Sequence, residues 1–167
     1  MGTLVKRPEI MAFLDKTPNS SYTWKRIGNG MTTGSYSYEA SETSETYIVD
    51  DNATTTIDSY TLSFDGEMKC IFGDDVYDYI NGLRYNLATG SDATSHLLLV
   101  DKYDEITASS GKFRAQLFDC SISISSYGGD GGATPTISFK ISANGTPKKG
   151  YATISSGTPT FHEGFSA

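Results

Sequence analysis

The chain has 167 residues, of which 37% are hydrophobic and 12% are aromatic, and its formal net charge is −7. This length suits one domain with a sizeable core. The negative charge argues against sequence-independent binding to nucleic-acid phosphates. No window approaches the ~18 apolar residues of a membrane-spanning helix. We expect no signal peptide, because residues 1–16 lack a continuous apolar stretch.

Residues 1–21 are expected to form an N-terminal arm. Pro8 is placed to begin a short helix that would run through Leu14 and stop at Pro18. Such a helix is too short to be stable alone. The arm should therefore dock on its own domain or on a neighbouring subunit.

A single β domain is predicted for residues 22–156, beginning with a strand at residues 22–27 that places Tyr22 and Trp24 on one face. Residues 36–59 are mostly polar, and we expect them to form a long projecting hairpin, although a mobile loop also fits this composition. This hairpin has no base between its first and last acids. Its acids are Glu39, Glu42, Glu45, Asp50, Asp51 and Asp58.

Residues 60–70 alternate apolar and polar side chains, which predicts a strand with one face on a core. Residues 73–85 are the one convincing helix, with Asp74 placed to cap its first turn. Its apolar stripe is Val76, Tyr79, Ile80 and Leu83. We expect this flanking helix to cover one opening of the β structure.

Two further strands are predicted at residues 97–100 and 112–125. In the second strand the apolar positions change parity between Leu117 and Phe118. A change of this kind requires a bulge, or a strand that switches the sheet it packs against.

A β-hairpin is predicted near the C-terminus, with strands at residues 136–143 and 151–155 and a turn that begins at Asn144 and Gly145. Residues 157–167 are expected to be a loose C-terminal tail. The predicted fold class is therefore mainly β: a sandwich or barrel of two packed antiparallel sheets with one flanking helix.

No catalytic, metal-binding or cofactor-binding constellation is found in the sequence. His96 and His162 do not lie at metal-ligand spacing from each other or from a cysteine. The glycine-rich residues 127–132 lack the Lys–Ser/Thr pair of a phosphate-binding loop. Cys70 and Cys120 are expected to be reduced, buried thiols. We therefore predict no enzymatic activity.

Several elements between residues 44 and 92 follow one another in a characteristic order. They are a Tyr–Ile pair before a polar turn, IDSY at the start of a strand, the GD-V-DYI-LR helix and a TGSD loop. With YTWKRIGNG at residues 22–30 and YGGDGG at residues 127–132, they are spread over residues 22–132, more than half of the chain. This order resembles the tail tube (major tail) proteins of long-tailed bacteriophages.

The resemblance implies a structural protein that forms rings of six subunits, stacked into a hollow tube that conducts DNA. The implied partners are further copies of the chain, the tape measure protein, and the tail tip and tail terminator proteins. Viral DNA would pass without specific binding. The implied location is the virion tail, after assembly in the host cytoplasm. Residues 36–59 would join neighbouring subunits or contact the next ring, and extended strands would line the lumen.

Head-to-tail stacking needs two different, complementary surfaces. Residues 1–26 carry five bases and two acids, a net charge of +3, whereas residues 39–58 carry −6. We hypothesise that the acidic hairpin contacts basic residues of an adjacent subunit. The candidate inter-subunit or lumen residues are Glu39, Glu42, Glu45, Tyr47, Ile48, Asp50 and Asp51 on the hairpin, and Lys6, Arg7, Lys25 and Arg26 near the N-terminus. A competing hypothesis places some acids in the lumen, where they would repel DNA phosphates within a Debye length of about 8 Å.

The alternative function is a secreted β-sandwich module that binds carbohydrate or mediates adhesion. Trp24 and the tyrosines would then supply a stacking platform. Export normally requires a signal peptide, which this sequence does not display.

Overall fold

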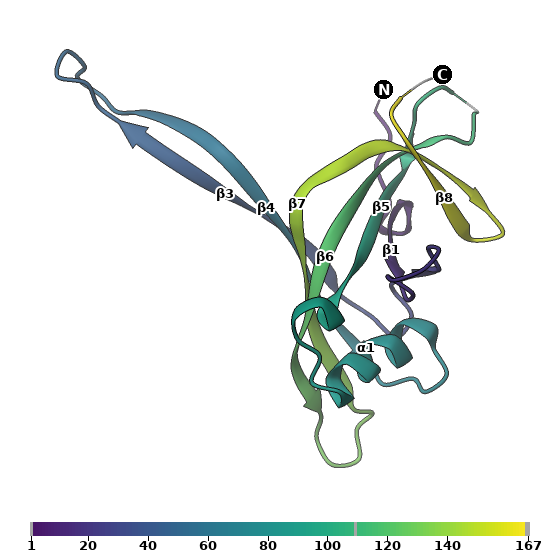
Figure 1. The fold of residues 1–167 in the computed structure, drawn as a ribbon. Helices are drawn as coiled ribbons and strands as arrows, with labels where there is room; N and C mark the ends of the chain where they lie inside the picture. Colours follow the sequence, from purple (N-terminus) through teal and green to yellow (C-terminus); the bar gives the residue numbers. More distant parts are fainter. Residues whose placement is uncertain (1, 109, 166–167) are drawn as a thin grey trace.

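The computed structural model describes residues 2–108 and 110–165, and this part of the chain forms an antiparallel sheet of eight strands and one α-helix (Figure 1). The strands are β1 (Ile10–Asp15), β2 (Trp24–Arg26), β3 (Gly34–Glu45), β4 (Thr54–Lys69), β5 (Thr94–Glu105), β6 (Phe113–Gly128), β7 (Thr136–Ser155) and β8 (Thr158–Glu163). The helix is α1 (Asp75–Tyr85), and the short 3-10 helices are η1 (Arg7–Glu9) and η2 (Gly90–Ala93). The mainly β fold class is confirmed. All eight strands belong to one sheet, so the division into two packed sheets is not confirmed.

The strand order is β2-β1-β5-β6-β7-β4-β3, and β8 also pairs with β7. β7 changes its outer neighbour along its length: residues 136–142 pair with β4, and residues 150–155 pair with β8. The sheet curls so that its two ends approach each other. Arg7, just before β1, donates a hydrogen bond of 3.3 Å to the carbonyl of Gly34 at the start of β3.

Apolar side chains are buried on both faces of this curled sheet. In β1, Ala12 and Leu14 belong to a larger cluster that also contains the buried residues of α1, whereas Met11 and Phe13 belong to a smaller cluster on the other face. The same switch occurs within β6: Ala115 and Leu117 lie in the smaller cluster, and Phe118, Cys120 and Ile122 lie in the larger one. The β6–β7 register shifts between Leu117 and Asp119, but the extra residues lie in β7. The β5–β6 register runs unbroken through Leu117 and Phe118. The change of parity therefore reflects a regularly alternating strand that contributes to both clusters, and not a bulge in β6.

Two terminal segments differ from their predictions. The predicted helix after Pro8 is wrong: residues 10–15 form β1, between β2 and β5. Residues 11–15 are all buried, and a short continuous apolar run does not by itself distinguish a covered strand from a buried helix. The expected loose tail contains β8, which pairs with the last six residues of β7.

The predicted hairpin around Asn144 and Gly145 is also wrong, because β7 continues through this point. Asn144 lies opposite Asp119 and Lys148 lies opposite Leu117, so residues 145–147 form a bulge against one residue of β6. The 16 residues of β6 provide a continuous partner for β7. The backbone can therefore satisfy its hydrogen bonds without folding back on itself.

The predicted helix and its cap are confirmed. The Asp74 carboxylate accepts hydrogen bonds from the backbone N–H groups of Val76 (3.1 Å) and Tyr77 (3.0 Å). Val76 and Ile80 are buried against the sheet. At the other end, the Arg84 guanidinium lies 4.0 Å from the ring centroid of Tyr127 on β6.

The first turn of α1 is tied to the N-terminal strands by two ion pairs. Asp75 accepts hydrogen bonds from the ammonium groups of Lys16 at 2.5 Å and Lys25 at 2.7 Å. The hydrogen bonds from Lys16 and Lys25 lower the pKa of Asp75 from 3.8 to about 2. Lys25, a predicted contact for a neighbouring subunit, is thus already paired within its own chain.

Asp75→Asn should remove a pH-dependent part of the stability. The pKa of Asp75 is lowered by folding, so its ion pairs stabilise the fold above about pH 4, and this contribution is lost as the pH falls toward about 2. Urea titrations of both proteins between about pH 6 and about pH 2 should show the difference in free energy of unfolding shrinking at low pH. A difference that stays constant over this range would contradict the assignment.

Gly150→Ala should destabilise the pairing of β7 with β8. A Cβ atom at Gly150 would overlap the backbone carbonyl oxygen of His162, and relief requires movement of the β8 backbone. We expect a loss of about 1–3 kcal/mol in the free energy of unfolding, measured by chemical denaturation. The control is Gly82→Ala in α1, where the added methyl meets no atom within 4 Å and should stabilise by about 0.5–1 kcal/mol. Wild-type stability for Gly150→Ala would refute this description of the junction.

Candidate assembly interface

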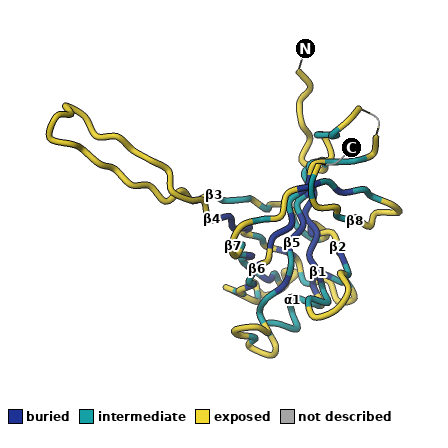
Figure 2. Tube along the Cα trace, turned by 45° about the horizontal axis from the view of Figure 1, so that its top comes forward, coloured by how far each residue is buried: buried dark blue, intermediate teal, exposed yellow. Residues whose placement is uncertain are grey.

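The β3–β4 hairpin projects well beyond the rest of the molecule (Figure 1). Its strands pair from Gly34 opposite Gly66 to Glu45 opposite Thr54, and residues 38–61 are all exposed, as Figure 2 shows. The 12 residues of β3, at ~3.3 Å per step, place the tip on the order of 35 Å from Gly34. The prediction of a long projecting hairpin at residues 36–59 is confirmed.

One face of the hairpin continues the apolar face of the core. Tyr38 lies opposite Leu62, and Ala40 lies opposite Tyr60, so these side chains share a face. Leu62 is buried in the larger cluster. Farther out, Tyr38, Tyr60 and Ile57 are 50–61% exposed. The hairpin therefore carries an exposed apolar stripe that has no covering layer within the described residues.

The predicted acids are distributed over both faces and the tip. Glu42 lies opposite Ile57 on the apolar face. A register shift after Ser41 leaves Asp58 as an extra residue, whose carboxylate accepts a hydrogen bond of 2.5 Å from the Thr43 hydroxyl. Among the described residues, no base forms an ion pair with any of the six hairpin acids.

The tip is a tight turn with two aliphatic residues at its centre. The backbone N–H of Asp50 donates to the carbonyl of Tyr47 at 2.9 Å, which places Ile48 and Val49 at the central positions. Both side chains are fully or almost fully exposed. Turns favour Gly, Pro, Asn, Asp and Ser at such positions, so local turn preference does not explain this aliphatic pair. The Tyr47 hydroxyl donates to Glu45 at 2.9 Å, and Asp51 follows the turn.

The predicted basic residues separate into two groups. Lys25 points to Asp75 on α1. Arg7 and Arg26 instead lie close together: Arg26 donates to the carbonyl of Pro8 at 2.9 Å, and Arg7 donates to the carbonyls of Ile10 and Gly34. No described acid forms an ion pair with Lys6, Arg7 or Arg26.

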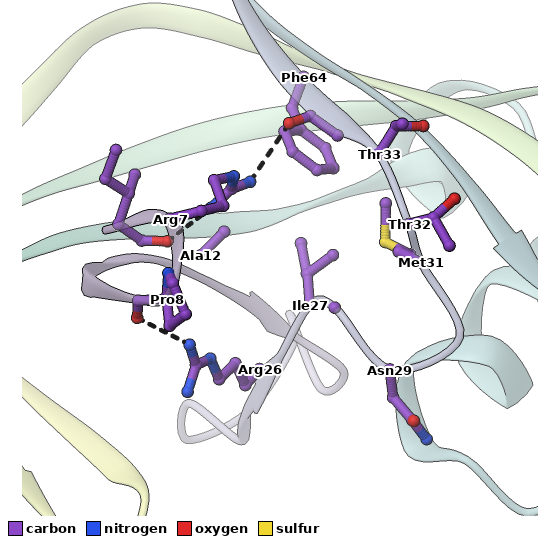
Figure 3. Close-up of a pocket in the computed structure, with 13 residues that line it drawn as sticks. Arg7, Pro8, Ala12, Arg26, Ile27, Asn29, Met31, Thr32, Thr33 and Phe64 are labelled. Atoms are coloured by element: carbon purple, nitrogen blue, oxygen red, sulfur yellow. Dashed lines mark hydrogen bonds between the residues drawn. The ribbon is translucent and has the colours of Figure 1, made fainter. Parts of the chain in front are cut away.

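Arg7 and Arg26 line a pocket of about 520 Å³ at the base of the hairpin (Figure 3). Its apolar lining comes from β1, β4 and the connection between β2 and β3. The apolar residues that line it include Ala12, Ile27, Met31 and Phe64. On another side, Asn29 donates its amide N–H to Asp74, the cap of α1, at 2.8 Å. The sequence did not predict this pocket, because its walls come from segments far apart in the chain.

The described residues contain no group of three or more His, Cys, Asp or Glu side chains placed to hold a metal ion. Within the same residues, no helix is both long and apolar enough to cross a membrane.

Both cysteines are free, as predicted; Cys120 is buried and Cys70 is half-buried. Burial raises the pKa of the Cys120 thiol to about 12, so this thiol is unreactive at neutral pH.

No known family model matches this chain, and no curated protein matches its sequence. Solved structures do share its fold. A chain from the tail of an empty gene transfer agent (GTA) particle, determined by helical refinement with C6 symmetry, superposes with a TM-score of 0.59 at 11% identity. A chain from the virion of a native GTA particle superposes with a TM-score of 0.61 at 10% identity. Each comparison covers 87% of this chain and 98% of the other. The mainly β architecture with one flanking helix is therefore shared with a chain of a GTA tail, in agreement with the resemblance to tail tube proteins.

Proposed function

We propose that this protein is a structural subunit of a phage-like tail tube, in which six copies form a ring and rings stack into a channel for DNA. The observation that carries this proposal is the projecting hairpin, whose apolar stripe is exposed and whose acids form no ion pair with any described base. The shared fold with a chain of a GTA tail of C6 symmetry supports the same assignment.

The hairpin is suited to contacts between subunits. It extends on the order of 35 Å beyond its base, farther than a surface loop of the same domain would need. A contact between this hairpin and a different surface of the next copy is heterologous, and such contacts produce rings or stacks. A neighbouring copy would also cover Tyr38, Ile57 and Tyr60, which are half-exposed or more in the single chain.

Charge determines which surface of the adjacent copy the hairpin would contact. The acids of residues 39–58 would face basic residues of an adjacent copy, among which Lys6, Arg7 and Arg26 form no ion pair with any described acid. Acids that remain outside such contacts would face the lumen and repel passing DNA phosphates at short range. The further proposed partners are the tape measure, tail tip and tail terminator proteins. The proposed location is the virion tail, after assembly in the host cytoplasm.

The position of Trp24 argues against the alternative function of carbohydrate binding. Trp24 is 8% exposed and stacks on Tyr22 with ring centroids 5.0 Å apart. A tryptophan in this position has no free face to offer a sugar ring.

Purified wild-type protein should assemble as its concentration rises. Negative-stain electron microscopy should show rings or tubes of uniform diameter, and sedimentation velocity should show large species in place of the monomer. A monomer that persists at every accessible concentration and ionic strength would contradict the proposed function.

Glu42→Lys/Glu45→Lys should weaken assembly. The double substitution replaces two carboxylates by two ammonium groups that would face basic residues of the adjacent copy. We expect the concentration needed for assembly to rise by about tenfold or more, which corresponds to ~1.4 kcal/mol. The matched control is Asp92→Lys/Asp130→Lys, which makes the same change of charge at exposed positions off the hairpin. If both double variants assemble equally well, the hairpin acids do not contribute to the interface.

A further inference from the structure

We propose that the pocket lined by Arg7, Arg26, Ile27, Met31 and Phe64, here called the socket, receives the hairpin tip of a second copy. The tip is defined as residues 47–51. The inference rests on the proposed function and goes further, because it names the acceptor surface and fixes the spacing between successive copies.

The composition of the tip indicates that its side chains are buried in the assembly. Ile48 and Val49 occupy the centre of a turn, where polar residues are preferred, and both project into solvent. An element whose residues contradict its local preference points to a functional constraint. Exposed aliphatic side chains flanked by charged ones are typical of a surface that meets a partner.

The socket has the matching shape and polarity. Ala12, Ile27 and Phe64 are buried, and Met31 is partly buried and packs against the same cluster, so the walls that they form are apolar and fixed in place. The volume of about 520 Å³ lies within the range of ~300–1,000 Å³ of pockets that enclose a small ligand. It can accommodate the aliphatic pair of one turn.

The charges at the socket and at the tip are also complementary. Arg26 uses one hydrogen bond, to Pro8, and Arg7 uses two, to Ile10 and Gly34. A guanidinium has five N–H donors, so both arginines keep donors for a carboxylate. Tip acids next to the aliphatic pair would supply these carboxylates in charge-assisted hydrogen bonds. The acids at the tip are Glu45, which flanks it, and Asp50 and Asp51.

Two acids near the socket are already engaged. Glu9 accepts a hydrogen bond from the backbone N–H of Lys6 at 2.8 Å. Asp74 accepts from Asn29 and from the first N–H groups of α1. The helix N-terminus offsets the negative charge of Asp74. Among the described residues that line the socket, Arg7 and Arg26 are the charged ones, and none is an acid.

The tip cannot reach the socket of its own chain. Gly34 and Phe64 line the socket and also form the base of the hairpin, and the paired strands hold the tip on the order of 35 Å away. The contact must therefore join two copies. Each copy then offers one tip and one socket, so successive copies are related by a step on the order of 35 Å, and in the proposed stacking the contact repeats from one ring to the next.

Two variants test this contact by mixing. The tip variant Ile48→Asn/Val49→Gly replaces the aliphatic pair by residues that favour a turn, so the hairpin should remain folded. The socket variant Arg26→Glu/Thr32→Glu places acids at two exposed positions of the rim. Each variant alone should stop at the unstacked unit, whether a monomer or a single ring. An equal mixture should form pairs of this unit and nothing longer, because only one of the two possible contacts is intact.

The outcomes separate this inference from the proposed function. Failure of the wild-type protein to assemble would refute the proposed function. Assembly of the wild type together with unchanged stacking of both variants would refute the socket alone. Circular dichroism and denaturation midpoints close to those of the wild type show that each variant is folded.

Cysteine cross-linking provides a direct measurement of proximity that does not depend on loss of assembly. Val49→Cys/Thr32→Cys should form a ladder of disulfide-linked multimers under oxidation, with each single variant as a control. Val49→Cys/Thr160→Cys places the second thiol on exposed β8 and should form no ladder. A ladder through position 160 and none through position 32 would overturn the assignment of the socket.

Discussion

The central physical constraint in this protein is that β4 serves two different structures along its length. Residues 63–66 pair with both β3 and β7, and residues 67–69 pair with β7 alone, so this inner part belongs to the core; residues 54–62 pair only with β3. A two-stranded ribbon with no second layer is marginally stable in water. It cannot bury its own apolar face, so Tyr38, Ile57 and Tyr60 remain exposed. The fold thus anchors the ribbon at its base and leaves the apolar face of its outer half uncovered, which is where the proposed assembly would place a second copy.

Elements that are determined by residues close together in the sequence could be predicted from it. The α1 helix combines a 3.6-residue apolar period with an aspartate cap, and both depend on residues within one turn of each other. The hairpin combines extended-chain composition with acids that disfavour burial. The parity change at Leu117 and Phe118 indicates that β6 contributes to both faces of the sheet, because side-chain direction in a strand alternates with period two. In each case the physical cause lies within the segment itself.

Elements whose existence depends on distant partners could not be predicted. β1 is a strand because β2 and β5 pair with it, and β7 is continuous because β6 runs beside it from residue 136 to residue 152. Asp15 is another example: its buried carboxylate accepts from the backbone N–H groups of Thr17 and Thr23 and lies 3.0 Å from His96. His96 is 81 residues away in the chain. The socket belongs to the same class, since chain separation conceals the proximity of Arg7, Arg26 and Phe64.

Charge and apolar contact have different roles in the proposed assembly. At physiological ionic strength the Debye length is about 8 Å, so the hairpin acids act on a neighbouring copy only near contact. Their effect is to select a basic surface and reject an acidic one, which matters for a chain of net charge −7. Affinity must come mainly from water released when apolar side chains such as Ile48, Val49 and Tyr60 are covered. In the proposed assembly, the shared negative charge would keep separate copies apart, and the apolar contacts would fix one register once two copies meet.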